Sequence, residues 1–204
     1  VGASQLRNGE LLSWSRDGTL RLWSADGVQL AEAFGHRYGV GGARELDNGQ
    51  LLSWSSYGEL SLWSSRGTLV RSFVGVWPHG AIELKNSWDS RFLSGSSDGD
   101  LCFWSAEATP IARRVGHNGP ILGEAQLPDG RLMSWSMDGT LRIWSTLGEL
   151  IVELVGHRKP VRGACELRDR RLLSWSEDGT LRLWDGASGA PLAVLQGHTG
   201  GNKG

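Results

Sequence analysis

The sequence predicts an all-β protein built from five similar four-stranded antiparallel sheets. Three observations lead to this prediction: one phrase recurs five times at a period of about forty residues, each copy alternates polar and apolar residues, and glycine is about twice as frequent as in an average protein. With 30 glycines and only 6 prolines among 204 residues, the glycine excess indicates many turns between short strands.

The recurring phrase is a pair of strands joined by a tight turn, and its first copy runs from Leu11 to Trp23 as LLSWSRDGTLRLW. Residues 11–15 and 19–23 are predicted as strands, and Asp17-Gly18 supplies the turn of a hairpin. The phrase closes on a tryptophan at steps of 40, 41, 40 and 40 residues, namely at Trp23, Trp63, Trp104, Trp144 and Trp184.

Two further strands complete each unit. A Gly-Ala-x-x-Leu segment precedes the phrase, as in residues 2–6, and an apolar run follows the closing tryptophan, as in 28–34. A Gly-His pair then leads into the next unit, with its histidine at His36, His117, His157 and His198 and with Gly75-Val76 in that place before the third copy. Because one such sheet cannot cover both of its faces, we expect the units to pack face to face around an axis. They occupy approximately residues 1–35, 36–75, 76–116, 117–156 and 157–198 of a single domain, with a tail at 199–204.

Composition and charge exclude several classes of protein. No apolar run approaches the roughly 20 residues that span a bilayer, so no membrane segment is expected. Lys and Arg total 21 against 22 Asp and Glu, without a block of like charge, which argues against nucleic acid as a partner. Cys102 and Cys165 lack the spacing of a disulfide framework or a zinc site. No signal peptide is evident and the first residue is Val, so we expect a cytoplasmic protein and a mature fragment or excised piece of a longer chain.

The Gly-His pair, the Ser-x-Asp-Gly turn and the closing Thr-Leu-Arg-Leu-Trp segment resemble the WD-repeat family of β-propellers, whose period is about 40–45 residues. The likeness covers essentially the whole chain, although the literal Trp-Asp pair occurs once, at Trp184-Asp185, and Ser follows the other closing tryptophans. The resemblance implies a β-propeller of five four-stranded blades. They are expected either to close as a ring of five or to belong to a larger ring, completed by additional blades or by another copy of the chain as a homo-oligomer.

The resemblance also implies a structural hydrogen-bond relay in each blade, made of the Gly-His histidine, a serine of the second strand, the turn aspartate and the closing tryptophan. Such buried polar groups need partners in any case, because leaving them unpaired costs a few kcal/mol. The expected members are His36, Ser55 and Trp63 in the second blade, Ser96, Asp98 and Trp104 in the third, His117, Ser136, Asp138 and Trp144 in the fourth, and His157, Ser176, Asp178 and Trp184 in the fifth. The first blade has Ser15, Asp17 and Trp23, whereas Tyr57 replaces the aspartate of the second blade and Val76 the histidine of the third.

Catalytic and metal-binding interpretations fail on the same pattern. Residues 95–99 fit the G-x-S-x-G signature of a hydrolase, but they are the third copy of the repeated phrase and lie between two strands, where that signature needs a strand followed by a helix. The histidines recur once per blade, so they are spread around the axis and cannot converge on one metal ion. We therefore expect no enzyme activity, no metal and no cofactor.

Function is expected where the repeats disagree, because positions required by the fold should repeat. The loop at 75–80 is shorter than its counterparts and that at 84–94 is longer. In a propeller the Ser-x-Asp-Gly turns and the Gly-His loops share one rim, where aromatic and arginine side chains are typical of interaction hot spots. The candidate partner-binding residues on this rim are Arg37, Tyr38, Tyr57, Trp77, His79, Met137, Arg158, Lys159 and Glu177. For Trp77 an alternative is that it fills the space left by the missing histidine of the third blade.

Two functions of different class follow. The first is a scaffold or sensor module that binds a protein or peptide across the rim, as the resemblance implies. The second is a propeller that binds a small ligand or a glycan, with aromatic side chains as stacking platforms. Equivalent pockets in every blade would favour the second function, but the copies share their predicted scaffold residues and vary at the rim. The strand tryptophans at 14, 54, 135 and 175 are expected to pack between blades.

Overall fold

The computed structural model describes residues 1–55, 57–74, 80–85, 92–107 and 109–196, and all strands in these ranges belong to five four-stranded antiparallel sheets. The predicted all-β architecture is confirmed.

We number the sheets as blades 1 to 5. Blade 1 contains β1 (Gly2–Gln5), β2 (Leu11–Trp14), β3 (Thr19–Trp23) and β4 (Gln29–Phe34). Blade 2 contains β5 (Val40–Glu45), β6 (Leu51–Ser55), β7 (Glu59–Trp63) and β8 (Leu69–Val74). Blade 3 contains β9 (Ile82–Glu83), β10 (Phe92–Gly95), β11 (Asp100–Trp104) and β12 (Pro110–Val115). Blade 4 contains β13 (Ile121–Gln126), β14 (Leu132–Ser136), β15 (Thr140–Trp144) and β16 (Leu150–Val155). Blade 5 contains β17 (Val161–Glu166), β18 (Leu172–Ser176), β19 (Thr180–Trp184) and β20 (Pro191–Gln196).

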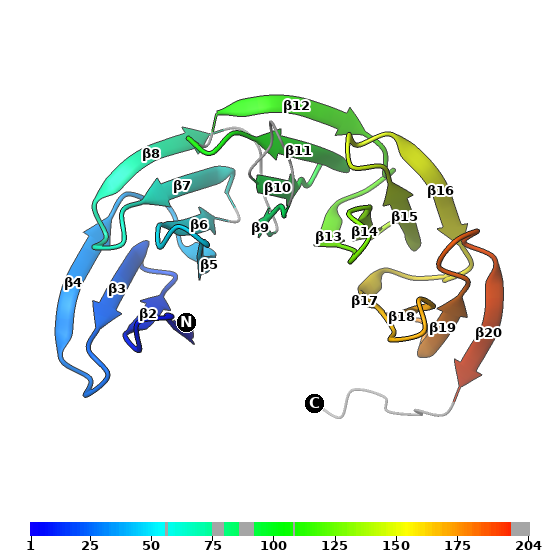
Figure 1. Ribbon diagram of the computed structural model, residues 1–204, viewed down its shortest axis with the longest axis horizontal. Helices are drawn as coiled ribbons and strands as arrows, with labels where there is room; N and C mark the ends of the chain where they lie inside the picture. Colours follow the sequence, from blue (N-terminus) through cyan, green and yellow to red (C-terminus); the bar gives the residue numbers. More distant parts are fainter. Residues whose placement is uncertain (56, 75–79, 86–91, 108, 197–204) are drawn as a thin grey trace.

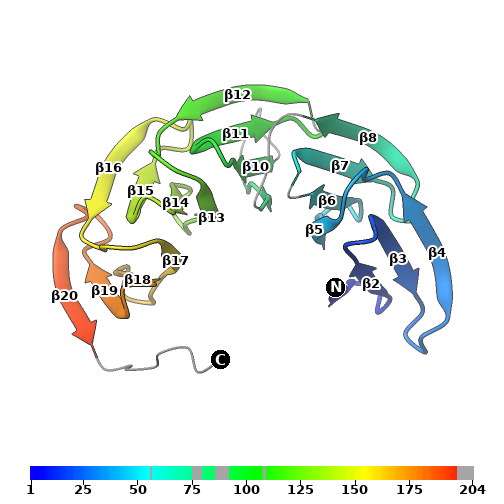
Figure 2. The same ribbon diagram turned by 180° about the vertical axis from the view of Figure 1, so that it is seen from behind.

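The blades stand side by side in an open arc, with the first strand of each blade on the inside and the fourth on the outside (Figure 1). Blades 1 and 5 lie at the two ends of the arc, as the view from behind also shows (Figure 2). Because neighbouring strands are antiparallel, the turns between second and third strands and the loops between blades share one rim, which we call the upper rim. The remaining turns form the lower rim.

The closing tryptophans join the blades. The side chain of Trp63 in blade 2 is 1% exposed and packs in one cluster with Leu20 and Leu22 of blade 1. Trp104, Trp144 and Trp184 likewise pack in clusters with residues of the preceding blade. Each of these large side chains therefore removes apolar surface of two blades from water, at about 25 cal/mol for each Å² buried.

The two end faces of the arc lack this cover. Trp23 of blade 1 is only partly buried, whereas its four counterparts are buried. On blade 5, Leu173, Leu181 and Leu183 are partly exposed, although the residues at the same positions in blades 1 to 4 are buried. Both end faces thus carry apolar side chains of the kind that face another blade elsewhere in the chain.

A second repeated contact joins the blades at the lower rim. In blades 2, 3 and 4 the side chain at the end of the first strand accepts a hydrogen bond from the backbone N–H of a residue in the preceding blade. Glu45 accepts from Arg7 at 2.8 Å, Glu83 from Asp47 at 2.7 Å and Gln126 from Lys85 at 2.6 Å. Between blades 4 and 5 the donor position is Pro128, which has no N–H, and the Glu166 carboxylate oxygens make no hydrogen bond within the described residues. The chain therefore lacks this contact at one blade junction.

Candidate functional site

The histidine relay of blade 4 shows how the scaffold satisfies its buried polar groups. The Trp144 Nε1–H donates to Ser134 Oγ at 2.9 Å, and His117 Nε2 lies 2.8 Å from the same oxygen. His117 Nδ1 lies 3.0 Å from Asp138 Oδ2. Since Ser134 accepts from the tryptophan, its hydroxyl donates to Nε2, and the proton of the imidazole sits on Nδ1 facing the carboxylate. Burial lowers the pKa of His117, which keeps the ring neutral.

Blade 5 repeats this geometry. The Trp184 Nε1–H donates to Ser174 Oγ at 2.9 Å, His157 Nε2 lies 2.8 Å from that oxygen, and His157 Nδ1 lies 3.0 Å from Asp178 Oδ2. Burial also lowers the pKa of His157. Both ring nitrogens of each of these two histidines therefore have a partner within the blade, as a structural role requires.

The structure differs from the sequence prediction in the serine of the relay. The serines that contact the closing tryptophans are Ser13, Ser53, Ser94, Ser134 and Ser174. The predicted Ser55, Ser96, Ser136 and Ser176 lie two residues later and accept from backbone N–H groups of the following turn. Residues two apart on a strand share a face, so alternation alone does not distinguish the two serines.

Blade 2 replaces the missing aspartate in a way that the sequence analysis missed. Glu59, two residues after Tyr57, places Oε2 3.2 Å from His36 Nδ1, and the same oxygen accepts from the Arg37 N–H at 2.9 Å. His36 Nε2 lies 2.6 Å from Ser53 Oγ, and burial lowers the pKa of the ring. Because Glu59 serves the relay, the side chain of Tyr57 is not needed in it.

In blade 3 the two acids of the turn region pair with one cation of the fourth strand. Arg113 hydrogen-bonds Asp100, which is buried, and its Nη2 lies 3.3 Å from Asp98. The position of the missing histidine, Val76, lies outside the described residues, as do Trp77 and His79. The Trp104 Nε1–H donates to Ser94 at 3.0 Å as in the other blades.

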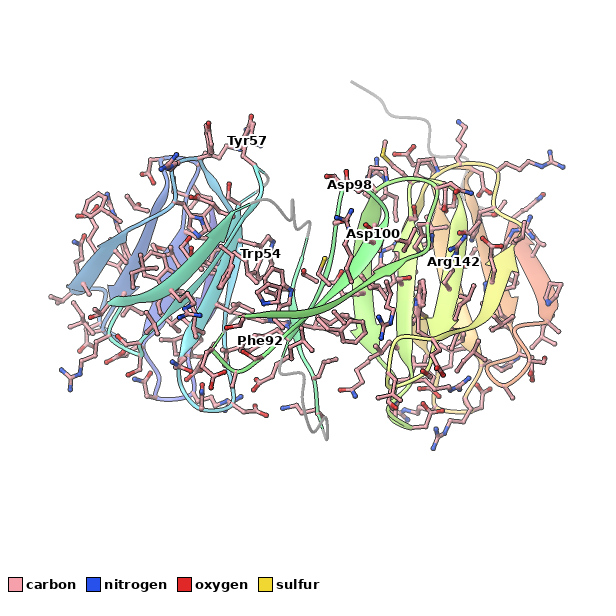
Figure 3. The ribbon with its side chains drawn as sticks, turned by 90° about the horizontal axis from the view of Figure 1, so that it is seen from above. Trp54, Tyr57, Phe92, Asp98, Asp100 and Arg142 are labelled. Carbon is pink, nitrogen blue, oxygen red and sulfur yellow. The ribbon has the colours of Figure 1, made fainter. Side chains whose placement is uncertain are left out.

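Two tyrosines from neighbouring elements meet on the upper rim. Tyr57, on the turn after β6, has its ring centroid 4.8 Å from that of Tyr38, on the loop between blades 1 and 2. Both side chains are about half exposed, at 56% and 53%. Figure 3 shows Tyr57 projecting at the edge of the molecule. Arg37, which is also exposed, directly precedes Tyr38 in the chain. The structure therefore brings two of the predicted rim residues into contact.

A cavity of about 870 Å³ opens beside the tyrosine pair, between blades 1 and 2, and is lined by Val1, Trp14, Arg16, Gly39, Val40, Gly41 and Tyr57. Two glycines of the lining differ from the residues at the same positions in other repeats. Gly39 stands where blades 4 and 5 have Pro120 and Pro160, and Gly41 where they have Leu122 and Arg162. A Cβ atom added to Gly39 would lie 2.7 Å from the Arg16 Cα, so this glycine lets the loop pass close to the turn that carries Arg16. The sequence analysis did not single out Arg16, although it is the one cation at this position of the turn.

The remaining predicted rim residues lie farther along the arc. Met137 is 50% exposed on the turn after β14, and Arg158, Lys159 and Glu177 are exposed in or beside blade 5. Glu177 accepts from Arg162 Nε at 2.7 Å. These four residues share the upper rim with the tyrosine pair but belong to other blades. Of the strand tryptophans, three pack as partly buried members of interblade clusters, whereas Trp175 on the end face is exposed.

One buried carboxyl stands apart from the relays. Glu124 of β13 is 7% exposed and faces blade 3, where Cβ atoms added to Gly80 and Gly95 would lie 3.0 Å from its two oxygens. Ala43 and Ala164 occupy its position in blades 2 and 5, and Gly95 stands where the other blades have tryptophan. Burial raises the pKa of Glu124 to about 7, and Oε2 makes no hydrogen bond to the described part of the chain. The carboxyl occupies space that a tryptophan vacated.

Within the described ranges, no group of three or more His, Cys, Asp or Glu side chains is arranged to hold a metal ion. The same part of the chain contains no helix that is long and apolar enough to span a membrane. Cys102 is buried and Cys165 is exposed, and both are free thiols.

Comparison with known proteins agrees with this geometry. The family model described as "WD domain, G-beta repeat" matches residues 108–145 and 148–185. No curated protein sequence matches the chain. Among solved structures, the chain is similar to the C-terminal WD40 domain of Sif2, with a TM-score of 0.84 and 25% identity over 98% of this chain and 58% of that one. It is also similar to the WD40 β-propeller domain of Doa1, with a TM-score of 0.76 and 22% identity over 95% of this chain and 67% of that one. The chain thus spans less than two thirds of the Sif2 domain.

Proposed function

Because the chain is an array of WD40 repeats folded as β-propeller blades, we propose that it is a non-catalytic scaffold that binds a peptide segment of a partner protein. The binding surface is the upper rim at blades 1 and 2. The observation that carries this proposal is the exposed Tyr38–Tyr57 pair at the mouth of an 870 Å³ cavity.

The repeats explain why this pair is available for binding. In blades 4 and 5 an aspartate of the turn serves the relay, whereas in blade 2 Glu59 takes over and Tyr57 points to solvent. Tyrosine offers a large contact area with little conformational entropy to lose, and its hydroxyl can exchange hydrogen bonds with a partner. Exposed aromatic side chains on a rigid frame are a frequent source of binding energy in protein interfaces.

Two contacts hold blades 1 and 2 together beneath the tyrosine pair. The Trp63 ring is buried between blades 1 and 2, and the Arg7–Glu45 hydrogen bond joins the same two blades at the lower rim. A peptide that binds at the upper rim therefore meets a preorganised surface, which reduces the entropy that binding must offset.

The test is selection from a randomised displayed peptide library, followed by measurement of the dissociation constant of the selected peptides. We expect Tyr38→Ala and Tyr57→Ala each to weaken binding at least tenfold, since a hot-spot aromatic contributes about 2 kcal/mol or more. Leu147→Ala is the matched control, because Leu147 is 71% exposed on the lower rim of blade 4. It should leave the dissociation constant unchanged.

Failure to select any peptide whose binding depends on the tyrosines would overturn the proposal. Binding of glycans in place of peptides, with the same dependence on Tyr57, would favour a glycan-binding propeller.

A further inference from the structure

The cavity between blades 1 and 2 carries an unbalanced positive charge. Arg16 lines it, and no Asp or Glu is among the residues that line it. Arg37 lies next to Tyr38 at the same rim. Among the described residues, no carboxylate lies within ion-pair distance of the Arg16 or Arg37 guanidinium.

Asp17, which follows Arg16 in the chain, and Glu59, which follows Tyr57 by two residues, already have hydrogen-bond partners within the protein. Asp17 Oδ1 accepts from the Thr19 N–H at 2.9 Å and from the Thr19 hydroxyl at 2.7 Å, and these hydrogen bonds lower the pKa of Asp17. Glu59 is buried against His36 and accepts from the Arg37 backbone, so its charge is held below the rim. Neither carboxylate is among the residues that line the cavity.

Two other arginines near the upper rim, Arg113 and Arg162, are paired within the chain. Arg162 hydrogen-bonds Glu177, and Arg113 contacts both Asp98 and Asp100. The contrast matters because these pairs leave little net charge for a partner, whereas Arg16 keeps its full charge beside the exposed aromatic rings. Electrostatic complementarity of this kind selects partners and registers more than it adds raw affinity.

We propose that the cavity takes an acidic side chain of the bound peptide, with Arg16 as the residue that sets this preference. Trp14 and Tyr57 line the same cavity. They would contact the apolar part of the bound peptide, next to its carboxylate. The partner is therefore a protein segment in which an aspartate or glutamate lies next to an aromatic or aliphatic residue. This inference rests on the peptide-binding function proposed above.

The test repeats the peptide selection with the wild-type chain, with Arg16→Glu and with Arg66→Glu. Arg66 is an exposed arginine on the lower rim of blade 2, so it matches Arg16 in charge but lies away from the cavity. We expect wild-type peptides to be rich in Asp and Glu, and Arg16→Glu to weaken their binding about tenfold. Peptides selected anew on Arg16→Glu should carry Lys or Arg at that place, and Arg66→Glu should behave as the wild type. Arg16→Gln, which removes the charge without reversing it, serves if Arg16→Glu does not fold.

The outcomes separate the two proposals. Peptides that bind through the tyrosines but show no acidic preference, or that bind Arg16→Glu as well as the wild type, would overturn this inference and leave the peptide-binding function intact. An acidic preference that Arg66→Glu abolishes equally would also overturn it, since the effect would then come from overall charge. Absence of any tyrosine-dependent peptide would instead refute the function on which the inference rests.

Discussion

The buried carboxyl of Glu124 makes the stability of the junction between blades 3 and 4 depend on pH. In the unfolded chain the group ionises near its ordinary pKa of 4.5, whereas burial raises the pKa to about 7 in the folded chain. Below about pH 4.5 the carboxyl is protonated in both states and imposes no penalty. Between about pH 4.5 and pH 7 the unfolded chain releases this proton while the folded chain still holds it, so the free energy of unfolding falls as pH rises. Above about pH 7 the loss levels off.

The size of this effect follows from the two values. Raising the pKa of a carboxyl from 4.5 to about 7 destabilises the folded state by about 3 kcal/mol once the group is ionised. Glu124→Gln keeps the shape of the side chain and removes the ionisation. We therefore expect the variant to be about 3 kcal/mol more stable than the wild type at about pH 8, with the difference shrinking toward zero at about pH 4.

The assay is chemical denaturation of both proteins across this pH range, followed by tryptophan fluorescence. The histidines of the relays have lowered pKa values and reduce stability at acidic pH in both proteins, so only the difference between the two curves reports on Glu124. A difference that does not change with pH, or a variant that is less stable than the wild type at about pH 8, would show that burial at this junction does not raise the pKa of Glu124 as described.

Two further sets of substitutions test the scaffold. Ser53→Ala leaves the buried Trp63 N–H and a relay histidine without their shared partner and should lower the free energy of unfolding by about 3 kcal/mol, whereas Ser55→Ala should lower it by about 1 kcal/mol or less, both measured by urea denaturation. Equal losses would contradict the revised relay. Pro128→Ala restores a backbone N–H opposite Glu166 and should raise the free energy of unfolding by about 1 kcal/mol after the entropy of the more flexible unfolded chain is deducted. The gain should disappear in a Glu166→Ala background, and a gain that persists there would have another cause.

The repeat pattern was sufficient to predict the blades, because strand alternation, turn glycines and closing tryptophans are local or periodic signals. The pattern did not show which of two serines on the same face of a strand contacts the tryptophan. Ser53 and Ser55 lie on one face of β6, and only the structure shows that Ser53 meets the Trp63 ring. The replacement of the turn aspartate by Glu59 is of the same kind, since the acid moves by two residues and keeps its face.

The candidate site was predicted in part. Tyr38 and Tyr57 were identified because they differ from their counterparts in the other repeats, and the structure places their rings in contact. The cavity beside them was missed, because its lining combines residues of two blades, with Arg16 on blade 1 and Gly39 and Gly41 at the start of blade 2. Residues across a blade junction are about twenty-five apart in sequence, and no periodic signal links them.

The measurement that tests the central claim most directly is hydrogen–deuterium exchange of the wild-type chain with and without a selected peptide. If the rim of blades 1 and 2 is the binding surface, the peptide should slow exchange in residues 14–18, 37–41 and 57–58 and leave the lower rim and blades 4 and 5 unchanged. Protection confined to the lower rim, or spread over the end faces of blades 1 and 5, would contradict the account and place the partner on a different surface of the array.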